Sequence, residues 1–171
     1  MSTYADFLAA KRRRAPSIGR TIDPGDLHPM LRDHQRYGVE WAARVGRAAI
    51  FWDCGMGKTF AQLEWARVSA DTSLVLAPLS VARQTVREAP SIDIDARYVR
   101  SPDQMDGPGV YVTNYEMAQA FDPSMFGAVV LDESSILKNV DGTTRRVLTD
   151  LVKAVPRRLA WLATSAPNDV F

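Results

Sequence analysis

The strongest constraint on the fold is a repeated alternation of short apolar runs with helical segments from residue 31 onward. The runs are apolar almost throughout, which is typical of strands in a parallel sheet that is covered on both faces. The segments that we expect to be strands are 48–51, 73–77, 96–99 (as an edge strand), 110–113, 128–132 and 158–164.

Helical patterns fill the intervals between these runs. Right-handed crossovers would then place helices on both faces of the sheet, which predicts a three-layer α/β domain with a mostly parallel central sheet. We expect this domain to span 31–171, after an N-terminal helix and an extended connector within 1–30. The expected helices are 3–14, 31–44, 58–69, 81–89, 115–120 and 143–155.

Composition excludes several classes of protein. The 171 residues are 46% hydrophobic and 24% charged, which is a globular balance for one domain. The net charge of +1 gives no evidence for or against nucleic-acid binding, so a basic site would have to be a local patch. The run from Arg12 to Arg14 is a candidate for such a patch, and a solvated charge cluster is the alternative. A single cysteine, Cys54, excludes an internal disulfide and a multi-cysteine zinc site.

Targeting signals are missing from this sequence. No apolar run approaches the roughly 20 residues that a membrane helix needs, and the first residues do not resemble a secretory signal. We therefore expect no membrane partner and a cytoplasmic location.

The segment WDCGMGKT at 52–59 lies between an expected strand and an expected helix, as a phosphate-binding loop requires. Gly55 and Gly57 would allow a tight turn that points N–H groups inward, and the following helix N-terminus adds partial positive charge. Lys58 would reach the β- and γ-phosphates, and Thr59 would ligate Mg²⁺. The alternative is a glycine-rich turn that binds nothing. The expected nucleotide contacts in the loop are Gly55, Met56, Gly57, Lys58 and Thr59.

Trp52 stands where the strict motif has glycine. A side chain of this size is most simply accommodated beneath the loop, so we expect Trp52 to pack there.

An acidic pair, Asp132 and Glu133, follows the apolar strand expected at 128–132. Asp132 would hold Mg²⁺, and Glu133 would orient and deprotonate the water that attacks the γ-phosphate. A solvated strand end is the alternative. With Lys58, these two carboxylates are the predicted catalytic residues, and the predicted cofactors are ATP and Mg²⁺.

Together these segments resemble the first, RecA-like motor lobe of superfamily-2 helicases, and within it the Swi/Snf-like branch of bacteriophage-type DEAD/DEAH-box-like proteins. The resemblance covers 31–169, and its segments occur in the family's order. They are LRDHQRYGVEW (31–41), DCGMGKT (53–59), APLSV (77–81), TNYEM (113–117), DESSILKN (132–139) and TSAPND (164–169).

The resemblance implies further roles. Gln35 would read adenine through its amide, and Ser80, Arg83 and Thr113 would contact a nucleic-acid backbone, more specifically that of DNA. The residues that would couple ATP state to the nucleic acid are Ser135, Thr164 and Ser165.

The sequence departs from the family at three points. Ser134 and Ser135 replace the usual Ala-His, and Ser165 and Ala166 replace residues of the usual Thr-Gly-Thr-Pro. The third departure is that no second motor lobe, which supplies an arginine finger in the family, is found among these residues. We therefore expect a lobe that binds ATP but needs a partner protein or chain for hydrolysis, in a bacterial or phage-infected cytoplasm.

Two other functions stay open at this point. A nucleotide-binding regulatory module would act through protein binding alone. A small kinase would need an arginine-bearing lid and an acceptor pocket.

Overall fold

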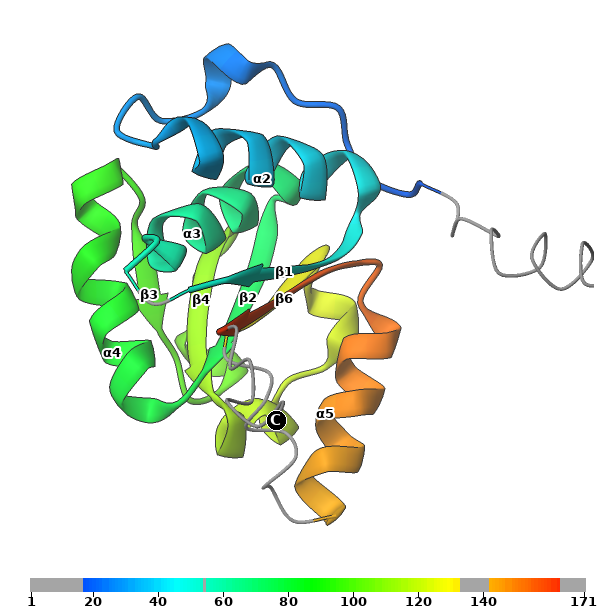
Figure 1. Ribbon diagram of the computed structural model, residues 1–171. Coiled ribbons are helices and arrows are strands. Elements are labelled where there is room, and N and C mark those ends of the chain that lie inside the picture. The colour runs from blue at the N-terminus through cyan, green and yellow to red at the C-terminus, as the bar shows by residue number, and fades with distance from the viewer. Residues whose placement is uncertain (1–16, 54, 133–141, 164–171) are drawn as a thin grey trace, which may run out of the picture.

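The computed structural model describes residues 17–53, 55–132 and 142–163, and the sheet at its centre has six parallel strands (Figure 1). The strand order is β1-β6-β5-β2-β4-β3, and every pairing is parallel. The strands are β1 Arg47–Trp52, β2 Thr72–Ala77, β3 Ala96–Tyr98, β4 Gly109–Asn114, β5 Ala128–Leu131 and β6 Arg157–Ala163. The expected parallel sheet is therefore confirmed.

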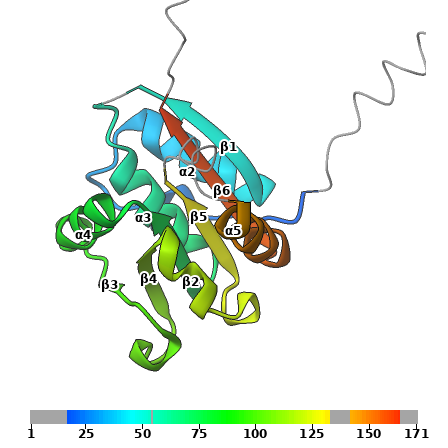
Figure 2. The ribbon, with the colours of Figure 1, turned by 90° about the horizontal axis from the view of Figure 1, so that it is seen from below.

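Helices cover both faces of this sheet (Figure 2). One face is covered by α2, α3 and α4, and the opposite face by α5 with the short 3-10 helices η4 and η5. The α-helices are α2 Asp33–Val45, α3 Lys58–Ser69, α4 Leu79–Glu88 and α5 Gly142–Ala154. The 3-10 helices are η1 Pro24–Asp26, η2 Ala89–Ile92, η3 Pro102–Gln104, η4 Tyr115–Ala120 and η5 Pro123–Met125. This is the predicted three-layer α/β arrangement, whereas the helix expected at 3–14 lies outside the described residues.

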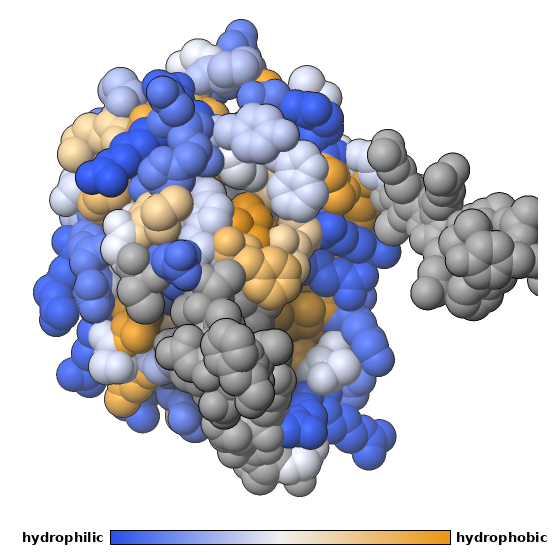
Figure 3. All heavy atoms as spheres, viewed as in Figure 1, coloured by the Kyte–Doolittle hydropathy of each residue, from blue (hydrophilic) through white to orange (hydrophobic). Residues whose placement is uncertain are grey.

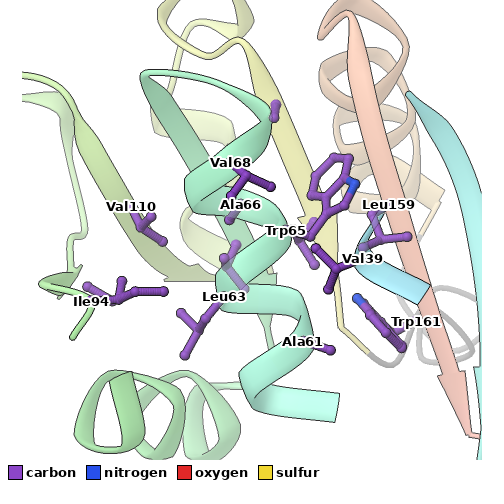
Figure 4. Close-up of a cluster of buried hydrophobic side chains, with 14 of the residues drawn as sticks. Val39, Ala61, Leu63, Trp65, Ala66, Val68, Ile94, Val110, Leu159 and Trp161 are labelled. Carbon is purple, nitrogen blue, oxygen red and sulfur yellow. The ribbon is translucent and has the colours of Figure 1, made fainter. Parts of the chain in front are cut away.

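Helix α3 lies at the centre of the larger hydrophobic core (Figure 4). Its side chains are buried on nearly all sides, because α2 and α4 flank it and the sheet lies beneath it. Leu63 and Trp65 are fully buried, and each such side chain contributes about 2 kcal/mol or more through burial. The core therefore fixes the position of the first residue of α3, which is Lys58.

The segment before α2 is attached to α3 by hydrogen bonds to an ion pair within that helix, between Glu64 and Arg67. The carboxylate of Glu64 is fully buried, accepts a 2.8 Å hydrogen bond from Arg67 Nη2, and also accepts one of 2.7 Å from His28 N. Arg67 Nη2 donates in addition to Asp26 O at 2.7 Å. Hydrogen bonding to Glu64 raises the pKa of Arg67, so the guanidinium group stays charged throughout the neutral range.

None of the helices in the described parts of the chain is long and apolar enough to cross a membrane.

Candidate functional site

The candidate site lies at the carboxyl edge of the sheet, where β1 leads into the predicted phosphate loop. In the loop, Gly55 and Gly57 have left-handed backbones, with φ of 84° and 71°. Gly57 is the N-cap of α3, so the loop ends where the helix begins. Ligands bind at this edge in open parallel sheets, and a helix N-terminus there favours an anion.

The side chain of Lys58 connects the two ends of the loop. Its Nζ donates a hydrogen bond of 3.1 Å to Trp52 O, the carbonyl group at the end of β1. Thr59 follows in the first turn of α3 and is half-buried. Both predicted nucleotide contacts are therefore at the helix end that faces the loop.

Trp52 packs beneath the loop, as expected from its size. Its ring makes edge contacts with His34 at 5.1 Å and with Trp161 at 4.7 Å between centroids. Gly38 on α2 leaves room for it, because a Cβ atom there would lie 2.9 Å from Trp52 Cζ2.

Gln35 is buried and joins α2 to the loop. Its Nε2 donates to Met56 O at 3.1 Å and to Gly57 O at 2.9 Å, while its Oε1 accepts from Arg32 N at 2.8 Å. The amide thus holds the carbonyl groups of the loop in this structure, a role that the sequence did not suggest. The reading of adenine by Gln35 stays a prediction.

Asp132, which follows β5, lies next to α3, the helix that follows the predicted phosphate loop. Gln62 lies one turn after Lys58 on α3, and its Nε2 donates to Asp132 Oδ2 at 3.4 Å. The hydroxyl of Tyr115 donates to Asp132 O, and Asp132 N donates to Leu76 O at 2.8 Å. Residues of β2 and η4 therefore hold the backbone of Asp132, and Gln62 of α3 contacts its carboxylate.

The oxygen atoms around Asp132 suit Mg²⁺. Gln62 is fully buried, and its Oε1 has no hydrogen-bond partner among the described residues. Mg²⁺ prefers oxygen ligands and is usually held by one or two carboxylates, waters and phosphate oxygens. The described residues contain no group of three or more His, Cys, Asp or Glu side chains that could hold a metal ion.

The predicted nucleic-acid contacts differ in exposure. Ser80 and Arg83 are exposed on α4, three residues apart and therefore on one face of the helix. Thr113 is fully buried in β4, and its hydroxyl has no partner among the described residues.

A pocket of about 350 Å³ lies beside Arg83 and is lined in part by residues of the segments 77–81 and 113–117, whereas Tyr98 and Arg100 were not predicted. Arg100 lines it after the carboxyl end of β3, and Tyr98 donates a hydrogen bond of 2.7 Å to Asn114 Oδ1 in its wall. The position of Arg100 just after an expected edge strand was the available signal, because polar residues that follow parallel strands gather at one edge. The lining residues are Leu79, Arg83, Tyr98, Arg100, Asn114, Glu116 and Met117.

Hydrophobic atoms gather where β1 lies in the view of Figure 1, framed by hydrophilic ones (Figure 3). Phe51, next to the loop, is 60% exposed, and Tyr37 and Trp41 on α2 are 72% and 38% exposed. Large apolar side chains are thus accessible on the elements that precede the loop.

Several predicted residues lie outside the described part of the chain. They are Arg12 to Arg14, Glu133, Ser135, Thr164 and Ser165.

No protein-family model matches this sequence. No curated protein matches it either.

The fold is similar to that of the UvsW helicase from bacteriophage T4. One UvsW structure matches with a TM-score of 0.63 and 15% identity, over 95% of this chain and 60% of that chain. A second matches with the same TM-score and identity, over 95% of this chain and 34% of that chain. The chain therefore spans less than two thirds of each solved UvsW chain, and at this identity the likeness concerns the fold alone. It confirms the predicted RecA-like helicase-lobe fold class.

Proposed function

We propose that this chain is the ATP-binding motor lobe of a superfamily-2 helicase or translocase of the Swi/Snf-like, bacteriophage-type branch. The observation that carries the proposal is the contact between Gln62 and Asp132. This contact joins α3, which begins at Lys58, to Asp132 after β5. In the proposal, Lys58 and Asp132 therefore bind the same nucleotide.

In this proposal the loop holds the phosphates of ATP. Lys58 exchanges its contact with Trp52 O for a phosphate oxygen, while the left-handed turns at Gly55 and Gly57 present backbone N–H groups. Thr59 and Asp132 are the residues that would hold Mg²⁺, which neutralises phosphate charge when it is bound.

For hydrolysis we assign Glu133 the role of orienting and deprotonating water. Ser135, Thr164 and Ser165 are proposed to couple the state of the nucleotide to the nucleic acid. The arginine that stabilises the transferred phosphate would come from a second motor lobe, on another part of the chain or on a partner protein.

The nucleic-acid track is proposed to cross the start of α4 and the pocket beside it. Arg83 and Arg100 flank this pocket, and neither forms an ion pair within the described residues. Free guanidinium groups and the exposed Ser80 hydroxyl suit phosphodiester oxygens. Because Thr113 is buried, we leave it out of this face and add Arg100. DNA is the proposed nucleic acid.

The metal part of the proposal is tested by calorimetry of ATP binding with and without Mg²⁺. In the parent chain, Mg²⁺ should strengthen ATP binding, and Asp132→Asn and Thr59→Val should each remove most of that gain. Asp103→Asn, an exposed substitution of the same type on η3, should leave it intact. An equal gain from Mg²⁺ in all four proteins would overturn the assignment.

The nucleic-acid part is tested by measuring DNA and RNA affinity over a range of salt concentrations. Arg83→Gln and Arg100→Gln should each weaken DNA binding and lower the salt slope by about one. Arg87→Gln, on the same helix as Arg83 but exposed near its other end, is the control. ATP binding without any nucleic-acid binding at low salt would favour the regulatory module instead.

A further inference from the structure

A second concentration of positive charge lies at the opposite, amino-terminal edge of the sheet, away from the phosphate loop. A pocket of about 670 Å³ opens there between the end of α3, the starts of β2, β5 and β6, and the connector before α2. Its volume is within the range of small-molecule sites. The lining residues are Gly19, Arg20, Ser69, Ala70, Asp71, Thr72, Met125, Gly127 and Arg157.

The wall of this pocket contains hydrogen-bonding groups that the described residues do not satisfy. Arg157 Nε and Ser69 Oγ are both buried and have no partner there. Arg20, at the rim, is exposed, and neither it nor Arg157 forms an ion pair with Asp71. Buried groups that lack partners are rare in folded proteins and call for a ligand, a water or another explanation.

Two further arginines add to the positive charge at this edge. Arg47 and Arg158 are directly paired in the register of β1 and β6, where like charges are unfavourable. Arg158 Nε is buried without a partner among the described residues, and Arg47 Nε donates a hydrogen bond of 3.3 Å to the carbonyl oxygen of Pro156. Burial and the charge of Arg47 lower the pKa of Arg158. None of these four arginines has a carboxylate within ion-pair distance in the described part of the chain.

We propose that the pocket at the amino-terminal edge is a second anion site, in which Arg20 and Arg157 bind a phosphate group. Arginine guanidinium groups bind phosphate through paired N–H donors. The phosphate could belong to a free phosphorylated compound or to a nucleic-acid backbone. The site does not depend on the proposed ATPase function, because it shares no residue with the phosphate loop.

The test is an NMR titration of arginine Nε–Hε signals with pyrophosphate, and in parallel with a ten-nucleotide DNA strand, at constant ionic strength. The Lys58→Ala variant is titrated alongside the parent, because it removes the phosphate-loop contact and should keep the second site. A saturable shift of the Arg157 signal is expected in both proteins. Arg157→Gln and Arg20→Gln should each weaken binding about tenfold or more, as expected for the loss of a charge-assisted hydrogen bond.

Arg87→Gln serves as the control for the loss of one exposed arginine, and Arg20→Gln covers the case in which Arg157→Gln fails to fold. If pyrophosphate binds and both Arg157→Gln and Arg20→Gln weaken its binding, the proposal is supported and the ligand is a free phosphate compound. If only the DNA strand binds and the same two variants weaken its binding, the proposal is supported and the ligand is a phosphodiester. If neither probe binds, or if Arg20→Gln and Arg87→Gln have equal effects, the proposal is wrong.

Discussion

Gln35 and Gly57 are in contact across 22 positions of the sequence, with Gln35 Nε2 donating a hydrogen bond of 2.9 Å to Gly57 O. A Cβ atom at Gly57 would overlap that same Nε2 atom, and the backbone of Gly57 is left-handed. Glycine is therefore required here for two separate reasons, close approach and backbone conformation.

Substitutions of glycine should separate these two reasons. Gly55→Ala should cost about 1–2 kcal/mol, because its backbone is left-handed but a Cβ atom there meets nothing within 4 Å. Gly57→Ala should cost about 1–3 kcal/mol more, because it also displaces Gln35. Chemical unfolding measures both, with Gly142→Ala at an open position of α5 as a control that should change stability by at most about 1 kcal/mol. Equal costs at Gly55 and Gly57 would contradict the contact.

The amide of Gln35 should support stability as well as nucleotide choice. Gln35→Ala leaves loop carbonyl groups without their donor and should lower the free energy of unfolding by about 1–3 kcal/mol. Gln84→Ala, at an exposed position of α4, should cost under about 0.5 kcal/mol.

Calorimetry with ATP and GTP tests the predicted adenine contact separately. We expect the parent chain to prefer ATP and the Gln35→Ala variant to lose that preference while binding both nucleotides less tightly. The adenine contact would be contradicted if the parent chain bound ATP and GTP equally and Gln35→Ala weakened both to the same extent. Gln35 would then only hold the carbonyl groups of the loop.

The buried Glu64 should make Arg67 difficult to replace. Arg67→Met leaves a fully buried carboxylate without its cation and should cost about 3 kcal/mol, the low end for such pairs because Arg67 is itself 40% exposed. Glu64→Leu combined with Arg67→Met should restore part of that loss, since no unpaired charge then remains. Thermal unfolding of the single and double variants measures these changes in stability. A double variant that is less stable than Arg67→Met would contradict the cost assigned to the unpaired carboxylate.

Much of the fold could be predicted because each strand is a continuous apolar run in a doubly covered sheet. Helix α3 spans the 58–69 that we expected, since Lys58 follows a glycine loop and the helix ends just before the next strand. The strand order could not be predicted, because long-range packing decides it. For the same reason the pairing of Arg47 with Arg158 could not be foreseen.

The site was predictable where a motif is local and not where contacts join distant segments. Gly55 and Gly57 of the predicted phosphate loop lie directly before α3, which begins at Lys58. The role of Gln62 could not be predicted, because it depends on contact with Asp132, 70 residues away in the sequence. The burial of Thr113 follows from the interior place of β4 between β2 and β3, which no local pattern reveals.

Turnover of ATP should distinguish binding from catalysis. The 171-residue chain alone should release phosphate at a barely detectable rate, because an arginine finger contributes about 10³–10⁵ in rate in related enzymes. Adding a protein that carries a second motor lobe should restore turnover, and Glu133→Gln should abolish it while ATP stays bound. Glu40→Gln on α2 is the matched control. Brisk, DNA-stimulated turnover by the chain alone would show that no second lobe is needed.

The most direct test of the central claim is calorimetric titration of Mg²⁺–ATP into the parent chain, Lys58→Ala and Lys153→Ala. Both variants remove one lysine charge, but Lys153 lies exposed in the last turn of α5. We expect Lys58→Ala to weaken ATP binding about 10- to 100-fold, as for the loss of a charge-assisted contact to phosphate, and Lys153→Ala to bind ATP like the parent. Equal ATP affinity in all three proteins would contradict the phosphate-loop site.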